Sequence, residues 1–159
     1  KRQGSGTASY EGAYVGLMNL DTTANPAEVT GTVNINANFA DPKLEGELTG
    51  RVVDVNGTEI LLSDLVFINT AIKADGTFAG AVEISGEPDG GIGTFSGAVA
   101  GSGAPFIGGN VSVGSEAFNG LEEDFTEEEL SAIIGDDRSR IQEYGIFIIE
   151  ACGSLATDC

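Results

Sequence analysis

Alternation between apolar and polar residues dominates the first half of the chain. From Val29 to Phe39 every odd position is apolar or glycine, and every even position is Thr or Asn. Lys43–Val53 alternates in the same way, with Leu, Gly or Val at its even positions. Its polar face consists of Lys43, Glu45, Glu47, Thr49 and Arg51. A period of two residues indicates strands with one buried face. Because Asp41-Pro42 lies between the two runs, we predict that they form a β-hairpin.

Six further segments have the composition of strands. They are Ser9–Asn19, Glu59–Ile68, Thr77–Ile84, Gly93–Ala100, Pro105–Val113 and Tyr144–Ala151. Alternation is broken inside Glu59–Ile68, where a bulge is expected. Asn56-Gly57 and Asp75-Gly76 are turn signals. Short strands at regular spacing joined by turns indicate an all-β fold, either a sandwich or a barrel.

The position of the glycines and of the charges favours a soluble barrel. Eleven of the 24 glycines lie within the strand-like segments, where they suit a narrow interior filled by side chains of neighbouring strands. The outward faces of a membrane barrel contact lipid and are apolar. Here one predicted strand face carries Lys43, Glu45 and Glu47. If that face contacted lipid, a basic residue on it would cost ~2–4 kcal/mol. The buried aromatic residues are expected to be Tyr10, Tyr14, Phe39, Phe78 and Phe95.

One stretch, 116–143, lacks alternation and is rich in Asp and Glu. Thr126-Glu-Glu-Glu129 has the spacing of a capping box, in which the Thr hydroxyl and the Glu carboxylate bond the free amides at a helix start. Gly135 can end such a helix. We therefore expect a short acidic helical insert at 116–143, before the last strand.

Two interpretations of this insert stay open. It is either a solvated connection or a dedicated partner-binding element. In the second case apolar anchors ringed by charge would form the interface, as hot spots require. The candidate partner-binding residues are Phe118, Leu121, Glu122, Glu123, Asp124 and Phe125.

Composition excludes several classes of function. The 159 residues carry 7 basic and 25 acidic side chains, a formal net charge of −18, and no His or Trp. This balance argues against nucleic-acid binding, which depends on Lys and Arg. The absence of imidazole excludes Ser-His or Cys-His catalysis and His-ligated metals. No acidic pair occupies a recognisable catalytic setting, so we expect a non-enzymatic protein without cofactor or metal site. No apolar run is long enough for a transmembrane helix.

The length fits one domain, residues 1–159. Within it we expect an N-terminal arm at 1–8, the acidic insert at 116–143 and a short tail at 152–159.

Several motifs resemble the barrel domain of bacterial transferrin-binding protein B-like surface lipoproteins. Thr7-Ala-Ser-Tyr-Glu-Gly-Ala-Tyr-Val-Gly16 resembles its opening strand, and Tyr144-Gly-Ile-Phe147 its terminal strand. Leu44-Glu-Gly-Glu-Leu-Thr49, Thr77-Phe-Ala-Gly-Ala-Val82 and Thr94-Phe-Ser-Gly-Ala-Val99 resemble its repeated strand pattern, and Phe106-Ile-Gly-Gly-Asn110 a late glycine motif. The resemblance implies a single eight-stranded antiparallel barrel and a location that is extracellular or at the outer-membrane surface of a bacterium. It transfers no ligand-contact residue to this chain.

Two functions are consistent with this resemblance and with the residues. The first is non-catalytic binding of a protein or small solute, which in the family includes capture of host iron or haem proteins. The second is a structural subunit of a surface layer, appendage or particle, with self-assembly.

Cys152 and Cys159, the two cysteines, lack redox or metal-site spacing. The exported setting of the family implies that they form an intrachain disulfide, worth ~2.5 kcal/mol in the loop-entropy model.

Overall fold

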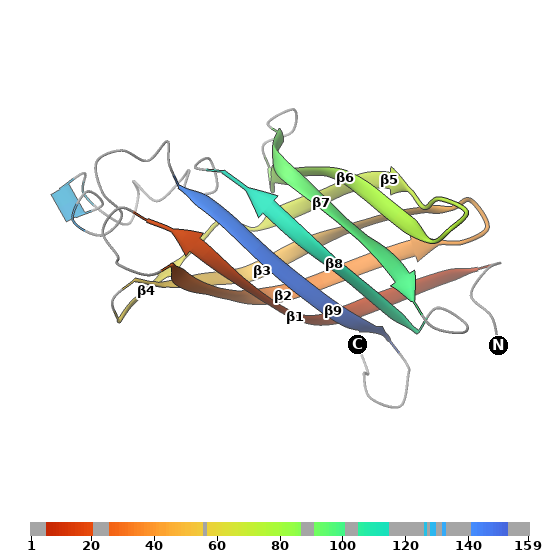
Figure 1. Cartoon of the computed structure of the whole chain (residues 1–159), viewed down its shortest axis with the longest axis horizontal. Coiled ribbons are helices and arrows are strands. Elements are labelled where there is room, and N and C mark those ends of the chain that lie inside the picture. The colour runs from red at the N-terminus through yellow and green to blue at the C-terminus, as the bar shows by residue number, and fades with distance from the viewer. Residues whose placement is uncertain are drawn as a thin grey trace.

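The chain forms a closed, tilted β-barrel in the computed structural model, which describes residues 6–20, 26–55, 57–86, 91–100, 105–114, 126, 128–129, 132 and 141–152 (Figure 1). Nine strands lie within these residues. They are β1 (Thr7–Asn19), β2 (Ala27–Asn38), β3 (Lys43–Val55), β4 (Thr58–Leu61), β5 (Leu65–Ala71), β6 (Thr77–Ile84), β7 (Gly91–Ala100), β8 (Phe106–Val113) and β9 (Gln142–Ala151). No helix among the described residues has the length and hydrophobicity to cross a membrane.

Eight of these strands close the barrel. Neighbours in the sequence pair antiparallel from β5 to β9, β1 pairs with both β2 and β9, and β3 pairs with β2 and β5. The predicted eight-stranded antiparallel barrel is therefore confirmed. The ninth strand arises because the segment Glu59–Ile68 is two strands: β4 pairs with Val52–Val55 of β3, and β5 begins after Leu62–Asp64. Closure leaves no long exposed sheet edge among the eight strands.

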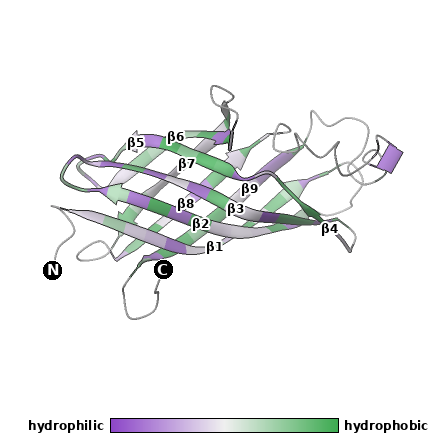
Figure 2. Ribbon diagram, turned by 180° about the vertical axis from the view of Figure 1, so that it is seen from behind, coloured by the Kyte–Doolittle hydropathy of each residue, from purple (hydrophilic) through white to green (hydrophobic). Residues whose placement is uncertain are grey.

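The barrel interior is filled by apolar side chains that come from every strand. Odd positions of β2 from Val29 to Ala37 point inward, as the alternation predicts, apart from Gly31, which is partly buried. Of the five aromatic residues expected in the core, Tyr10, Tyr14, Phe78 and Phe95 are buried and Phe39 is partly buried. Figure 2 looks onto the side of β2 and β3, where bands of both hydropathies alternate along the strands.

Glycines on neighbouring strands make room for the aromatic rings of this core. Gly80 of β6 lies opposite Phe95 of β7, and a Cβ added to Gly80 would lie 2.8 Å from Phe95 Cε1. Gly109 of β8 lies opposite Phe147 of β9, with 2.6 Å between such a Cβ and Phe147 Cζ. The rings also stack on one another, with 4.6 Å between the ring centroids of Phe67 and Phe95. The glycines of the sequence thus serve a narrow interior, as expected.

One prediction about the strand faces is wrong: Arg51 is fully buried and does not lie on the polar face of β3. Thr49 pairs with Thr32 and Val52 pairs with Thr30, so Gly50 and Arg51 together oppose a single residue of β2. This is a β-bulge, and Gly50 adopts the left-handed φ of 62° that such a bulge favours. The extra residue reverses the alternation after Leu48, so that Arg51, Val53 and Val55 face inward.

Two expected boundaries also shift. β1 begins at Thr7, so the last two residues of the expected N-terminal arm are paired with β2. β9 begins at Gln142, so Glu143 belongs to a strand and not to the acidic insert. The predicted capping box is present: the Thr126 N–H donates to Glu129 Oε1 at 3.0 Å, and the Glu129 N–H donates to Thr126 Oγ1 at 3.1 Å. Most of the insert lies outside the described residues, so the helical insert stays a prediction.

Candidate binding surface

The partner-binding residues expected from the sequence lie outside the described part of the chain. They are Phe118, Leu121, Glu122, Glu123, Asp124 and Phe125. Cys159 lies outside it too, so the disulfide stays a prediction. Cys152 follows β9, and its N–H donates to the carbonyl of Ser9 in β1 at 2.7 Å. The candidate surface described below was not predicted from the sequence.

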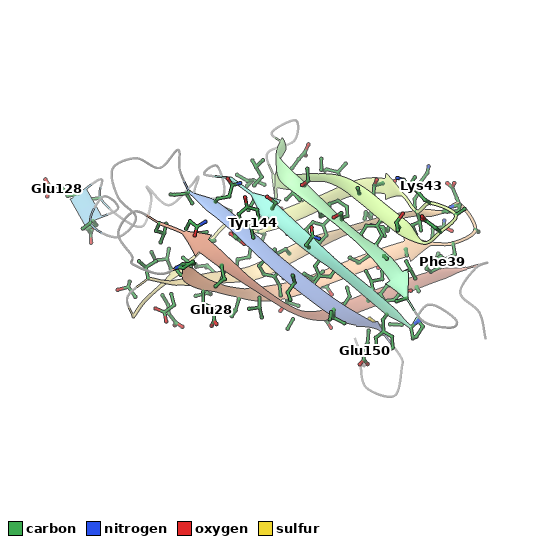
Figure 3. The ribbon with its side chains drawn as sticks, in the orientation of Figure 1. Glu28, Phe39, Lys43, Glu128, Tyr144 and Glu150 are labelled. Atoms are coloured by element: carbon green, nitrogen blue, oxygen red, sulfur yellow. The ribbon has the colours of Figure 1, made fainter. Side chains whose placement is uncertain are left out.

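A set of exposed apolar side chains covers the outer face of β1, β9 and the start of β8. We call this surface the apolar face, and its residues are Ala13, Val15, Leu17, Phe106, Tyr144, Ile146 and Ile148. The large members are exposed by between 40% for Phe106 and 74% for Ile148. Figure 3 looks onto this side of the barrel, with Tyr144 on β9 in the front layer. Contiguous exposed apolar side chains of this kind mark interaction sites more often than single exposed residues do.

Strand register brings these side chains together in pairs. Val15 lies directly opposite Ile146, and Leu17 lies directly opposite Tyr144, across the β1–β9 ladder. Ile148 lies opposite Gly108 of β8, whose missing side chain leaves the isoleucine uncovered on that side. A shallow hollow of about 510 Å³ lies over the upper part of the apolar face, lined by Val15, Leu17, Asn110, Ser112, Tyr144 and Ile146.

The charged residues that border the apolar face are all acidic among the residues described. Glu11 and Glu150 are cross-strand neighbours at one end, beyond Ala13 and Ile148. Glu28 of β2 lies opposite Leu17 at the other end. Figure 3 shows Glu28 and Glu150 at well-separated places on the barrel. The three described basic residues lie elsewhere: Lys43 begins β3, Lys73 follows β5, and Arg51 is inside the barrel.

The outer face of β2, β3 and β5 is different, because polar side chains predominate there and bond one another, beside the half-buried Val66 and Ile68 of β5. Ser9 Oγ donates to Asn36 Oδ1 at 2.8 Å, and Asn69 Nδ2 donates to Glu45 Oε1 at 3.1 Å. Lys43 forms an exposed ion pair with Asp41 at 3.3 Å. We call this surface the polar face. It has a hollow of about 550 Å³ at one end, lined mostly by such groups.

A buried polar cluster of Tyr14, Arg51 and Glu143 lies inside the barrel. Arg51 Nη2 forms an ion pair with Glu143 Oε1, and the Tyr14 hydroxyl donates to Glu143 Oε2 at 2.7 Å. Arg51 Nη1 donates to the carbonyl of Ser63 at 2.8 Å, within the break between β4 and β5. The bulge at Gly50 and the break at Leu62–Asp64 therefore face each other, and the guanidinium bonds a backbone carbonyl within that break.

Two glycines allow Tyr14 to reach Glu143. Gly16 and Gly145 are cross-strand neighbours, and a Cβ on Gly145 would overlap the Tyr14 ring. Burial raises the pKa of Tyr14 well above its ordinary value, and the adjacent Glu143 carboxylate raises it further. Arg51, Glu143 and Tyr14 are each 0% exposed. A solute has no access to these groups, so they do not form an open reaction site.

The described residues offer no metal site. No group of three or more Cys, Asp or Glu side chains has the geometry to hold an ion within them. The Asp54 carboxylate, near the end of β3, accepts a hydrogen bond from the Gly57 N–H at 2.8 Å. Asp75 likewise bonds Thr77 through both the backbone N–H and the hydroxyl. These carboxylates order turns, as Asp residues commonly do.

The sequence did contain a signal for the apolar face. Residues 144–149 read Tyr-Gly-Ile-Phe-Ile-Ile, so both faces of this strand are apolar. Residues 13–18 of β1, Ala-Tyr-Val-Gly-Leu-Met, have the same property. A strand whose two faces are both apolar is covered on both sides in most folds. Alternation alone identifies the inner face of such a strand and does not reveal the second, outward set of apolar side chains.

Solved structures give three informative likenesses. A mutant of the vaccine antigen transferrin binding protein B from Haemophilus parasuis Hp5 superposes with a TM-score of 0.56 and 14% identity, over 93% of this chain and 26% of that chain. Intact Ap-TbpB, with N and C lobes, gives a TM-score of 0.56 and 13% identity, over 95% of this chain and 27% of that one. A protein described as a surface lipoprotein gives 0.50 and 13%, over 91% of this chain and 61% of that chain.

These likenesses confirm the resemblance expected from the strand motifs, at the level of fold. The chain spans about a quarter of the length of the two transferrin-binding structures. No family model matches the sequence, and comparison with curated proteins gives no match. With identities of 13–14%, the chain shares the barrel architecture of transferrin binding protein B and surface lipoproteins.

Proposed function

We propose that this barrel is a non-enzymatic binding protein of the bacterial surface, which binds a protein partner through the apolar face. The observation that carries the proposal is the paired, outward set of Val15, Leu17, Tyr144 and Ile146. Burying exposed apolar area is favourable by about 25 cal/mol per Å². A partner that covers this face gains this contribution, against which the entropy cost of association is set.

The fold likeness supports the location and the class of function. The structures that resemble this chain are described as transferrin-binding proteins and a surface lipoprotein. Surface exposure and capture of a host iron or haem protein are the functions that this likeness favours for the chain. Fold alone does not assign function, and the apolar face supplies the argument that belongs to this molecule itself.

The interior of the barrel supports binding at the outside. Stacked aromatic rings and close aromatic–glycine contacts occupy the space that holds a ligand in wider barrels. The ionisable cluster at Arg51 is closed to solvent. A binding role for the outer surface and the absence of catalysis are both consistent with this arrangement.

Site-specific photocrosslinking tests the proposal. A photoreactive amino acid is placed at Ile146 on the apolar face and, as the matched control, at Asn36 on the polar face. Both positions are on strands and point outward. After irradiation in the native medium, we expect a defined protein adduct from position 146 and none from position 36. Mass spectrometry identifies the protein in the adduct. The affinity of the barrel for that purified protein is then measured. Equal adducts from both positions would contradict the proposal.

The same experiment separates binding from a structural role in an assembly. A structural subunit would use the apolar face to contact further copies of itself. Adducts of two identical chains, together with ordered self-association in sedimentation, would then support the structural role.

A further inference from the structure

We infer that the partner presents an apolar surface flanked by Lys or Arg side chains, which meet Glu11, Glu28 and Glu150 at the border of the apolar face. This inference rests on the proposed function and names the chemistry of the partner. The apolar part of that surface supplies the contact area, and the basic flank supplies the orientation. The three carboxylates are placed so that they face a partner seated on β1 and β9.

The centre of the apolar face contains no charge. Between Glu28 at one end and the Glu11–Glu150 pair at the other, the outward positions of β1 and β9 are all apolar. The neighbouring outward positions on β8 are Gly108, Asn110 and Ser112. An apolar centre depleted of charge with a polar rim is the usual anatomy of a protein interface. A highly charged ligand has nothing to pair with at the centre of this face.

Among the described residues, the charged side chains at the rim of the apolar face are all acidic. Glu11 and Glu150 are direct cross-strand neighbours at one end, and Glu28 lies at the other. A basic group that a partner places at either end meets carboxylates there. Because surface charges are screened beyond about 8 Å at physiological salt, the rim carboxylates dominate the field that a docked partner meets.

A second copy of the chain fits the apolar face poorly. Two copies packed face to face would bring Glu11, Glu28 and Glu150 of one chain near the same carboxylates of the other. The net charge of −18 adds repulsion at longer range. Among the described residues, Lys43 and Lys73 are the basic side chains outside the interior, and neither lies on the strands of the apolar face. In that packing, the part of the chain that the structure describes places no basic side chain against the rim.

Two synthetic amphipathic helical peptides provide a probe of defined chemistry. They share one apolar face and differ only in the flanking residues, which are Lys in one peptide and Glu in the other. Binding is measured by fluorescence anisotropy, and the contact is located by backbone amide shifts. We expect the Lys-flanked peptide to bind at least about tenfold more tightly than the Glu-flanked peptide at low salt. Amide shifts should concentrate in β1 and β9.

Matched variants locate the binding energy. Ile146→Ser removes an apolar side chain from the face, and Leu61→Ser removes an equally exposed one from β4, outside it. We expect Ile146→Ser to weaken binding of the Lys-flanked peptide at least about fivefold, and Leu61→Ser to leave it unchanged. Circular dichroism and thermal unfolding verify that both variants are folded.

A second pair of variants tests the charges, because an acidic protein attracts cationic peptides over its whole surface. The rim variant E11Q/E28Q/E150Q and the control E45Q/E47Q/E59Q remove the same number of carboxylates. We expect only the rim variant to lose about tenfold in affinity and to show a weaker salt dependence. Equal losses in the two variants, or equal binding of the two peptides, would overturn the inference.

The failure of this inference and that of the proposed function are distinguishable. If the crosslink from Ile146 identifies a partner but the peptides bind equally, the apolar face is a binding site without preference for a basic flank. If the Lys-flanked peptide binds at the apolar face but no partner is crosslinked there, the chemistry of the surface is confirmed and the proposed function is wrong. A sedimentation result showing a concentration-dependent dimer that Ile146→Ser abolishes would contradict the inference in favour of a second copy.

Discussion

The apolar face on β1 and β9 and the polar face on β2, β3 and β5 are two outer sides of one closed sheet. Inside the barrel both sides contribute similar apolar residues to one core. Outside, one side presents Val15, Leu17 and Ile146, and the other presents hydrogen-bonded Asn36, Glu45 and Asn69. Their hollows are nearly equal in size, at about 510 and 550 Å³.

This difference shows that core formation does not account for every apolar residue in the strands. The polar face demonstrates that a strand of this barrel packs well with polar residues on its outer side. Beyond the modest stabilisation of their cross-strand pairs, the outward apolar residues of β1 and β9 are therefore not explained by strand packing. The free energy of burying these side chains is gained only when another molecule covers them. The difference between the two faces therefore favours a binding role for the apolar face.

The largest expected effect concerns the ion pair that joins the two sides from within. Arg51 comes from β3, under the polar face, and Glu143 comes from β9, under the apolar face. Glu143→Gln leaves the Arg51 charge buried without its carboxylate, so we expect a loss of ~3–5 kcal/mol in the free energy of unfolding. Urea unfolding measures it. The double variant R51M/E143L should lose less than the single variant, and a single-variant loss below ~1 kcal/mol would contradict the buried pair.

Two adjacent isoleucines give the sharpest test of inside against outside. Ile149 is 1% exposed and Ile148 is 74% exposed, on the same strand. Ile149→Ala should lower the free energy of unfolding by ~2–5 kcal/mol, because it removes buried methyl groups and leaves a cavity. Ile148→Ala should change it by less than ~0.5 kcal/mol. Similar losses in thermal or urea unfolding would show that the outer side of β9 is covered by the chain itself.

Glycine substitutions test the packing beneath the apolar face. Gly145→Ala places a methyl group in the space of the Tyr14 ring and should cost ~1–3 kcal/mol. Gly108 faces outward, and the nearest atoms to an added Cβ are at 3.9 Å. Gly108→Ala should therefore be neutral or stabilising by ~0.5 kcal/mol. Chemical unfolding of the two variants in parallel provides the comparison, and a reversed order would contradict the assigned inner and outer sides.

The smallest expected effect is a pH dependence on the inner side of β1. Burial raises the pKa of Tyr10 to about 12, above its ordinary value near 10. The folded state holds the proton of the Tyr10 hydroxyl more tightly than the unfolded state does. The contribution of this group to the free energy of unfolding is therefore complete below pH ~10 and is lost as the pH rises toward about 12. Through this group, the free energy of unfolding changes by less than ~1.4 kcal/mol per pH unit. Tyr10→Phe should flatten the alkaline decline of unfolding free energy, and an unchanged decline would argue against burial as its cause.

Local sequence was sufficient for most of the architecture. Alternation in Val29–Phe39 identified the inner face of β2, and turn residues separated most of the strands. The capping box at Thr126 was readable because its two bonds depend on residues three apart. Features of this kind follow from period and spacing, which the sequence contains directly.

Arg51 shows where this reasoning fails. Its place in an alternating run predicted that its side chain is exposed. The bulge at Gly50 reverses the direction of the side chains that follow, so that Arg51 points inward. Residues near Arg51 in the sequence do not reveal that Glu143, 92 positions away, and the Ser63 carbonyl are there to receive the guanidinium. A buried charge is tolerated only when such partners exist, and partners distant in the sequence are a property of the closed barrel.

The sequence by itself determined the all-β class, the inner faces of most strands and the strongly acidic surface, because these depend on residue type and period. Tertiary structure alone decided that β1 lies beside β9 and that their second apolar faces meet as one surface. Val15 and Ile146 are separated by most of the chain and become neighbours only when the first and last strands close the barrel. Closure is a global event driven by the common core, and it brings the candidate binding surface into existence.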